Sequence, residues 1–243
     1  MSRGRTPHPP RHPLVHSVVT PVTPATAPDA QDEVSMTTIA PDRRTFLRAV
    51  GVSAAAGLGT LAITPRASAA GEKVLPTTYR EQPNFFYCGP TAVSIALSAK
   101  VTPPGLDTLA AELGTTDNGT NFGAVSPVLT NRLTGATYRD QWMGGTSASP
   151  ADADLLWQRA VANVDTGFAT VCNWWVVAGE YPNWGGNTSD IFHFVTIDGY
   201  NADERSLRIA DPAGSTLSST LPSHHWLSVQ QVATYCAGRG YFW

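Results

Sequence analysis

The pattern of apolar residues changes near residue 168, and this change restricts the fold more than any other feature of the sequence. Before that point, apolar side chains recur at helical spacing and are interrupted by Pro and Gly. After it, the chain is rich in β-branched and aromatic residues, as strands are. Helices followed by strands predict an α+β fold rather than a doubly wound sheet. We expect helices over residues 89–100, 106–113, from Ser126 and over 150–164, strands over 168–177, 193–200 and 205–210, and a closing helix over 227–235.

Two of these helices carry start signals. Ser149 precedes Pro150 and two aspartates, which is the pattern of a capped first turn with acids at the positive end of the helix dipole. Ser126-Pro127 is interpreted in the same way, as a cap followed by a first-turn proline. The sequence therefore predicts that Ser149 and Ser126 are N-cap residues.

The N-terminal 69 residues are predicted to lie outside the working domain. Arg43-Arg44 precedes an apolar stretch, 49–64, and then the small residues Ala67-Ser68-Ala69, so residues 36–69 are typical of a twin-arginine signal peptide. A retained membrane anchor is the alternative, but the apolar stretch is shorter than the roughly 20 residues that a membrane span needs. Residues 1–35 are predicted to be a disordered extension or to precede the true start at Met36.

The mature domain is predicted to be residues 70–243, which suits one domain with a core. It holds nine Lys or Arg against fifteen Asp or Glu and shows no basic stripe, so we expect no nucleic-acid partner. It has no long apolar run, so we expect no stable membrane association after the signal is cleaved. The expected location is extracellular, with the twin-arginine translocase as a partner during export.

Three cysteines remain in an exported chain, and the odd number leaves at least one thiol outside any internal disulfide. Cys88 stands at the start of a predicted helix, where the helix dipole and free N–H groups favour the reactive thiolate. A structural cysteine before a helix is the alternative. If Cys88 is a nucleophile, Cys172 and Cys236 are free to form a disulfide, or both are buried free thiols.

A histidine and an aspartate in the predicted strands supply the partners that a cysteine nucleophile needs. Strand alternation places Asp198 on the face opposite to His193. A hairpin turn centred on Ala202 would instead set Asp211 directly opposite His193, where it orients one ring nitrogen and leaves the other for Cys88. A core histidine and an Asp-Pro turn are the alternative readings of these two residues.

Four segments together resemble the C39-like cysteine peptidases, bacterial relatives of papain and of the bacteriocin leader peptidases. They are 82–92 with Cys-Gly-Pro, Gly119-Thr120, 193–200 and Asp211-Pro212, and they span nearly all of the mature chain. The resemblance implies a papain-like α+β fold in which Cys88 is the nucleophile, His193 the base and Asp211 its orienting partner. It also implies that Gln82 contributes to the oxyanion hole. This chemistry needs no cofactor and no metal ion, and His224-His225 are interpreted as loop residues.

The segment 173–190 is long and aromatic, and it departs from the family pattern. We expect Tyr87, Trp174, Trp175 and Trp184 to form a substrate-binding wall, with one of the two adjacent tryptophans in the core. The Gly185-Gly186 pair among them suggests a lid.

The sequence thus predicts a secreted cysteine peptidase that cuts a peptide or related amide bond through an acyl-enzyme. An acyltransferase or transpeptidase with the same triad is one alternative, and a catalytically silent module that binds the cell wall or a protein is another. The short stretch between Ala70 and Gln82 leaves no room for an inhibitory pro-domain, so we expect narrow specificity or a substrate met only outside the cell.

Overall fold

The computed structural model describes residues 71–180, 188–214 and 221–243. The predicted signal peptide, the extension before it, Trp184 and the Gly185-Gly186 pair lie outside these residues.

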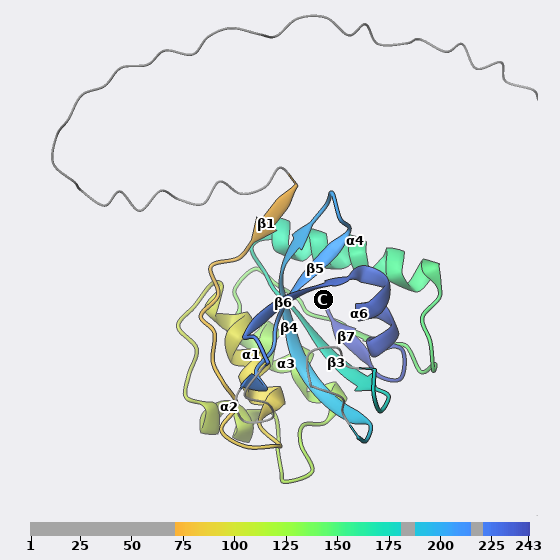
Figure 1. Ribbon diagram of the computed structural model, residues 1–243. Helices are drawn as coiled ribbons and strands as arrows, with labels where there is room; N and C mark the ends of the chain where they lie inside the picture. Colours follow the sequence, from red (N-terminus) through yellow and green to blue (C-terminus); the bar gives the residue numbers. More distant parts are fainter. Residues whose placement is uncertain (1–70, 181–187, 215–220) are drawn as a thin grey trace, which may run out of the picture. The chain divides into compact units, whose positions relative to one another are not determined.

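Seven strands of the described residues form one antiparallel sheet in the order β2-β7-β3-β4-β5-β6, with β1 paired to β4 beyond the end of β3 (Figure 1). The helical segments precede most of these strands along the chain, so the predicted α+β class is confirmed. The strands are β1 (Glu72–Val74), β2 (Asp140–Trp142), β3 (Thr170–Val176), β4 (Ile191–Asn201), β5 (Ser206–Ala210), β6 (His224–Ser228) and β7 (Gly240–Phe242).

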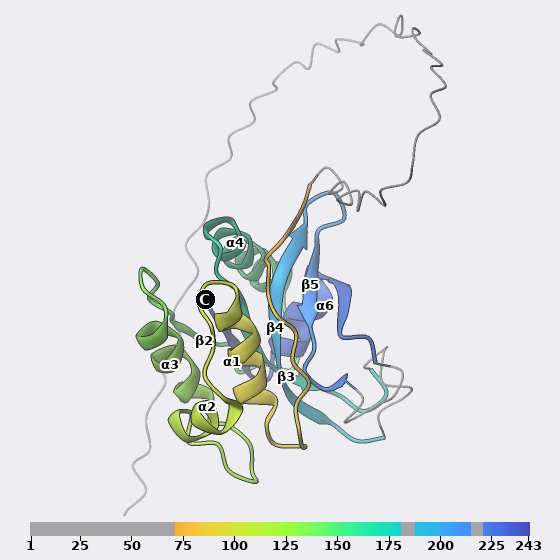
Figure 2. The ribbon, with the colours of Figure 1, turned by 90° about the vertical axis from the view of Figure 1, so that its left-hand side faces the viewer.

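Two clusters of buried apolar side chains lie on opposite faces of this sheet, because neighbouring residues of a strand point to opposite sides. Val171 and Phe194 pack with α1, α2 and α3, whereas Cys172 and Val195 pack with α4 and α6. Figure 2 shows α1 lying against β4, with α2 and α3 on the outer side of α1. The helices are α1 (Cys88–Ser98), α2 (Leu106–Glu112), α3 (Val125–Arg132), α4 (Pro150–Thr166) and α6 (Val229–Cys236), and a 3-10 turn, η1, spans Phe122–Ala124.

The Ser149 cap is present as predicted, and the Ser126 cap is not. Ser149 accepts a hydrogen bond from the backbone of Asp152, whose carboxylate binds the Ser149 N–H in return, so the two form a capping box. The N-cap of α3 is Ala124, because η1 already turns the chain and carries Ser126 inside the helix. The prediction for Ser126 was therefore wrong.

His224 and His225 were predicted to be loop residues, and this was also wrong. They form the start of β6, where His225 pairs with Ile209 and His224 pairs with Ala210. The closing helix accordingly begins later than expected, at Val229, with the Ser228 side chain as its cap.

The register of the hairpin between β4 and β5 differs from the predicted one. Asn201 pairs with Ser206, so the turn is centred between Asp203 and Glu204 rather than on Ala202, and a β-bulge between Ile197 and Gly199 then shifts the pairing by one residue. Strand β5 ends at Ala210, and Asp211 follows it. Continuing the pairing by one residue would set Asp211 opposite Val195, two residues along from His193 on the same face.

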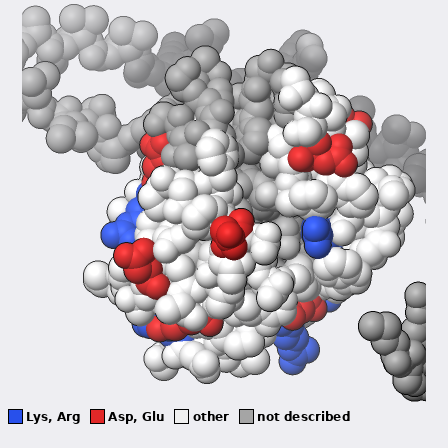
Figure 3. Space-filling model, turned by 90° about the horizontal axis from the view of Figure 1, so that it is seen from below, with Lys and Arg blue, Asp and Glu red and all other residues white. Residues whose placement is uncertain are grey.

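Charged side chains are dispersed among uncharged ones on the face shown in Figure 3. None of the helices in the described residues is both long enough and apolar enough to cross a membrane.

Candidate active site

Cys88 is the first residue of α1, and only 6% of it is exposed. Glycine fits at the next position, Gly89, because the side chain of Thr120 occupies the space in which a Cβ would lie. Thr120 is fixed by a hydrogen bond of 2.7 Å between its hydroxyl and that of Thr115. The predicted Gly119-Thr120 loop therefore packs directly onto the start of the helix that carries the thiol.

His193 lies on β4 and is bound to Asp211 just beyond β5. The distance from His193 Nε2 to Asp211 Oδ1 is 2.7 Å, and both side chains are almost fully buried. Asp211 Oδ1 also accepts a hydrogen bond from the Ala213 N–H at 2.9 Å, which holds the carboxylate in place. Nε2 is thereby committed to Asp211, and Nδ1 is the ring nitrogen left for the hydrogen bond between His193 and Cys88.

The prediction that Asp211 lies directly opposite His193 on a hairpin was wrong, although the contact itself is present. The structure brings His193 and Asp211 together as diagonal neighbours, a spacing that a long ring side chain can bridge. Asp198 lies elsewhere, as its strand position predicted: its Oδ2 accepts hydrogen bonds from Thr77 and Arg208.

The surroundings of the thiol favour its charged form. Burial disfavours a thiolate, but the hydrogen bond and charge of His193 and the backbone N–H groups of Phe194 and Gly89 outweigh it and lower the pKa of Cys88. Burial likewise disfavours a charged His193, but the charge and hydrogen bond of Asp211, followed by those of Cys88, raise the pKa of His193 to about 10. Each effect stabilises a thiolate–imidazolium pair at neutral pH.

Gln82 is buried beside this group. Its backbone N–H donates to the carbonyl of Pro212 at 2.8 Å, which ties its segment to the residue after Asp211. Its side-chain Nε2 donates to the carbonyl of Asn84 at 2.8 Å.

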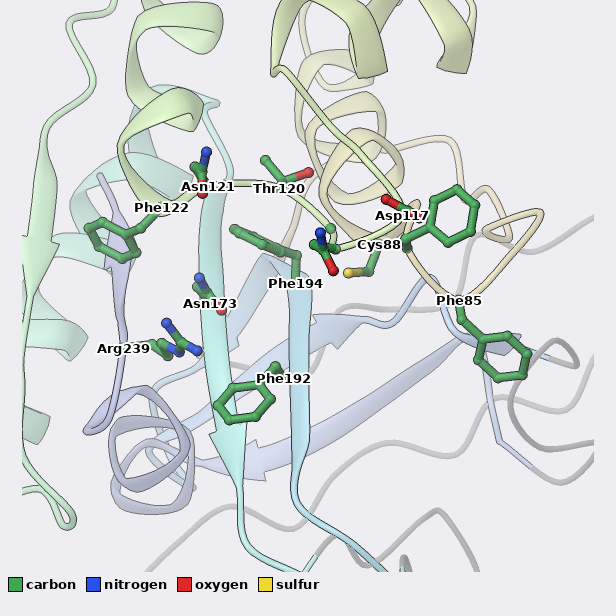
Figure 4. A pocket seen from close by; sticks show the side chains of 13 residues that line it. Phe85, Cys88, Asp117, Thr120, Asn121, Phe122, Asn173, Phe192, Phe194 and Arg239 are labelled. Atoms are coloured by element: carbon green, nitrogen blue, oxygen red, sulfur yellow. The ribbon is translucent and has the colours of Figure 1, made fainter. Parts of the chain in front are cut away.

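Cys88 opens into a cleft of about 380 Å³ (Figure 4). Strands β3 and β4 form its floor, and the loop before η1 forms one side. Cys88 is the member of the predicted triad that touches the open space, while His193 and Asp211 lie behind it. The lining residues are Phe85, Phe86, Cys88, Asp117, Asn118, Gly119, Thr120, Asn121, Phe122, Asn173, Phe192, Phe194 and Arg239.

The expected aromatic wall differs from the observed one. Trp174 is fully buried against Tyr235, so its assignment to substrate binding is wrong; it is the core member of the adjacent pair. Trp175 stacks on Phe192 and donates to Asp190, and Tyr87 donates to Asp107; neither lines the cleft.

The wall that the sequence reasoning missed consists of Asn173, Phe192, Phe194 and Arg239. Strand alternation already carried part of this signal, because Phe192 and Phe194 flank His193 and Asn173 precedes the core tryptophan. The sequence held no comparable signal for Arg239.

Cys172 and Cys236 are buried free thiols in this structure, and their side chains hydrogen-bond to each other. Burial is the main cause that raises the pKa of Cys236 well above its ordinary value, and the contact with Cys172 adds to it. The two thiols are neighbours in the core, and their pairing as a disulfide stays a prediction.

Comparison with known families gives a match to the Peptidase_C39 like family over residues 74–233. No curated protein matches the chain.

Three solved structures are similar to this chain. A double glycine motif protease from an AMS/PCAT transporter, in complex with the leader peptide, is 14% identical (70% of this chain and 91% of that one, TM-score 0.44). The peptidase domain of Streptococcus ComA is 12% identical (70% and 96%, TM-score 0.42). Xylellain, a cysteine protease from Xylella fastidiosa, is 12% identical (71% and 84%, TM-score 0.39). All three TM-scores lie below 0.5, so the family assignment depends on the family match alone.

Proposed function

Since the chain belongs to the Peptidase_C39 like family, we propose that it is an exported cysteine peptidase that hydrolyses a peptide or related amide bond through Cys88. The observation that carries the proposal is the buried chain of contacts from Cys88 through His193 to Asp211, which ends in an open cleft only at the thiol. A structural cysteine needs neither a charged imidazole beside it nor access to a cleft.

The reaction follows from this charge arrangement. The Cys88 thiolate attacks the carbonyl carbon of the substrate, and the electron pair of the C=O bond moves onto oxygen. Collapse of this intermediate breaks the C–N bond, and the leaving amine takes the proton of the His193 imidazolium. Water then attacks the thioester while neutral His193 accepts its proton, which releases the acid and restores the thiolate–imidazolium pair.

The negative oxygen of the intermediate needs donors that are already in place. We assign this role to the backbone N–H of Cys88 and to the side-chain amide of Gln82. Gln82 is well fixed for it, because its backbone is bonded to Pro212 and its amide to Asn84.

Digestion of a peptide library by the mature domain tests this function. We expect cleavage by the wild type, and a loss of it in Cys88→Ala with no change in the melting temperature beyond a few degrees. Cys172→Ala, which removes a buried thiol outside the cleft, serves as the matched control and should keep its activity. Full cleavage by Cys88→Ala would contradict the mechanism.

Mass spectrometry of the products in the presence of an added amine decides between water and another acceptor. Carboxylic acid products support a peptidase. Products that carry the added amine in place of acid would assign the chain to acyl transfer instead.

We also propose that residues 36–69 direct export by the twin-arginine translocase and that the mature domain begins near Ala70. The support is the order of Arg43-Arg44, the apolar stretch and the small residues 67–69. Replacing both arginines by lysine should keep the protein inside the cell, whereas the wild type should appear outside with an N-terminus near residue 70. Equal export of both forms would contradict this proposal.

A further inference from the structure

One end of the cleft carries a positive charge that has no part in the proposed mechanism. Arg239 is the one basic side chain among the described residues that line the cleft, and it forms no ion pair with any of them. Its guanidinium carbon lies 4.6 Å from the centroid of the Phe192 ring. A cation–π contact of this kind orients a guanidinium without neutralising its charge. In the view of Figure 4, Arg239 and Phe85 lie on opposite sides of Cys88.

Asn173 lies beside this charge, and its side-chain amide has no hydrogen-bond partner among the described residues. Only 6% of Asn173 is exposed, and its side chain makes no hydrogen bond to the described residues. Its neighbours across the sheet are Phe194 and Gly240. Its amide atoms are not fully enclosed by the protein, so a group that enters the cleft can bind them. Its position in the cleft wall makes a ligand the candidate partner.

The turn that carries Arg239 is held in place on both sides. A Cβ at Gly238 would overlap the Trp175 ring, and one at Gly240 would overlap the backbone carbonyl of Gln141. The Arg239 N–H donates to the Cys236 carbonyl at 2.9 Å, and its own carbonyl accepts from Met143 at 3.0 Å. The guanidinium is therefore presented to the cleft from a fixed backbone, as a binding group requires.

We propose that Arg239 and Asn173 form a subsite that binds a carboxylate of the peptide substrate. The planar fork of a guanidinium matches a carboxylate in two parallel hydrogen bonds, and the amide N–H of Asn173 adds a third donor. Asp117, the one acidic residue among the described lining residues, forms no ion pair with Arg239 and leaves that charge available. The inference depends on the proposed peptidase function, and it adds a substrate class to it.

Such a carboxylate has two sources, an acidic side chain or the C-terminus of the substrate. Two pairs of peptides distinguish them, both built on a neutral sequence that the wild type cleaves. One pair exchanges Glu for Gln at each position around the cleaved bond, with amidated C-termini. The other pair exchanges a free C-terminus for an amide.

We expect the wild type to prefer the carboxylate member of one pair by roughly 10- to 100-fold in kcat/KM, the effect of hydrogen bonds to a charged group. Arg239→Gln should abolish the preference while cleavage of the neutral peptides continues. Arg239→Glu should favour a peptide with Lys at the same position. Arg205→Gln is the matched control, because Arg205 pairs with Asp154 outside the cleft, and it should keep the wild-type preference.

Failure of this inference is separable from failure of the proposed function. If the neutral peptides are cleaved in a Cys88-dependent way but no preference exists, or if Arg239→Gln retains it, the subsite is wrong and the peptidase stands. If no peptide is cleaved, the peptidase is wrong. Fluorescence anisotropy of the same labelled peptides on Cys88→Ala then decides the subsite. A binding preference for carboxylate that Arg239→Gln removes supports it, and equal binding of both members overturns it.

Discussion

Two buried aspartates, Asp211 and Asp198, differ in the partner that each one holds. Asp198 lies on β4 and Asp211 directly follows β5, and both are fully buried. Asp211 binds His193, a group that can gain and lose a proton, and through it acts on Cys88. Asp198 binds Arg208 at 2.9 Å and Thr77 at 2.6 Å, and His224 Nε2 lies 3.5 Å from the same oxygen.

The comparison shows that burial of a carboxylate does not by itself indicate function. Arg208 stays charged at every accessible pH, so its pairing with Asp198 joins β5 to β4 without serving proton transfer, and Thr77 joins the segment after β1 to the same carboxylate. His193 can give up and take back a proton, with a pKa that Asp211 and Cys88 raise to about 10, and its ring reaches the thiol of the cleft. Asp198 also has a histidine, His224, nearby, so the two sites are separated by the contact of His193 with the Cys88 thiol rather than by the depth of the acid.

Exchange of Asp211 for Asn should have the largest effect. Asn keeps the shape and an oxygen acceptor but removes the charge that holds His193 protonated and oriented. We expect kcat/KM for a cleaved peptide to fall by about 10²-fold. Asp198→Asn, an identical exchange of a buried aspartate on the same sheet, is the matched control and should change activity by less than threefold. Equal losses of kcat/KM in both variants would contradict a catalytic role for Asp211 that Asp198 lacks.

In folding stability the order of the two variants should be reversed, with the larger effect in Asp198→Asn. Asp198→Asn leaves the Arg208 guanidinium, which is 21% exposed, without its charged partner. We expect this to lower the free energy of unfolding by about 3 kcal/mol in urea titrations, as loss of one member of a buried pair does. A change below about 0.5 kcal/mol would show that Asp198 is not a structural anchor.

The pH dependence sharpens the comparison further. The pKa of His193 is raised from 6.5 to about 10, so its stabilising contribution is fully present below pH 6.5 and is lost as pH rises through about 10. The pKa of Cys88 is lowered from 9.0, so its contribution is present above pH 9 and is lost as pH falls through the lower, folded value. Between pH 6.5 and 9, once the thiolate has formed, folded and unfolded chains each carry one proton on this pair, and its contribution is flat.

Removal of the Cys88 thiol should change the pKa of His193. In Cys88→Ala, His193 loses the hydrogen bond and charge of Cys88 while it keeps those of Asp211, so its pKa should fall. NMR titration of the ring protons of His193 in both proteins measures the difference. Cys172→Ala should leave that titration unchanged. An unchanged His193 pKa in Cys88→Ala would mean that the thiol and the imidazole do not interact.

The sequence was informative where local patterns govern the structure. Helix α4 and its Ser149 cap, the class of the fold and the placement of Asp198 away from His193 all follow from periodicity and capping. The contact between His193 and Asp211 was predicted for the wrong reason, because the shifted centre of the turn and the bulge at Asp198 are not encoded in strand alternation. The place of Arg239 in the cleft could not be predicted, since Arg239 arrives there through the pairing of β7 with β3, which joins residues far apart in the sequence.

The central claim is that Cys88 is a thiolate held by His193, and the rate of its alkylation tests this most directly. Iodoacetamide reacts with the thiolate, and mass-spectrometric mapping separates Cys88 from Cys172 and Cys236. At pH 6 we expect Cys88 to react faster than free cysteine, the two buried thiols not to react, and His193→Ala to remove the advantage of Cys88. Alkylation of Cys88 no faster than free cysteine at pH 6, or an equal rate in His193→Ala, would contradict the account.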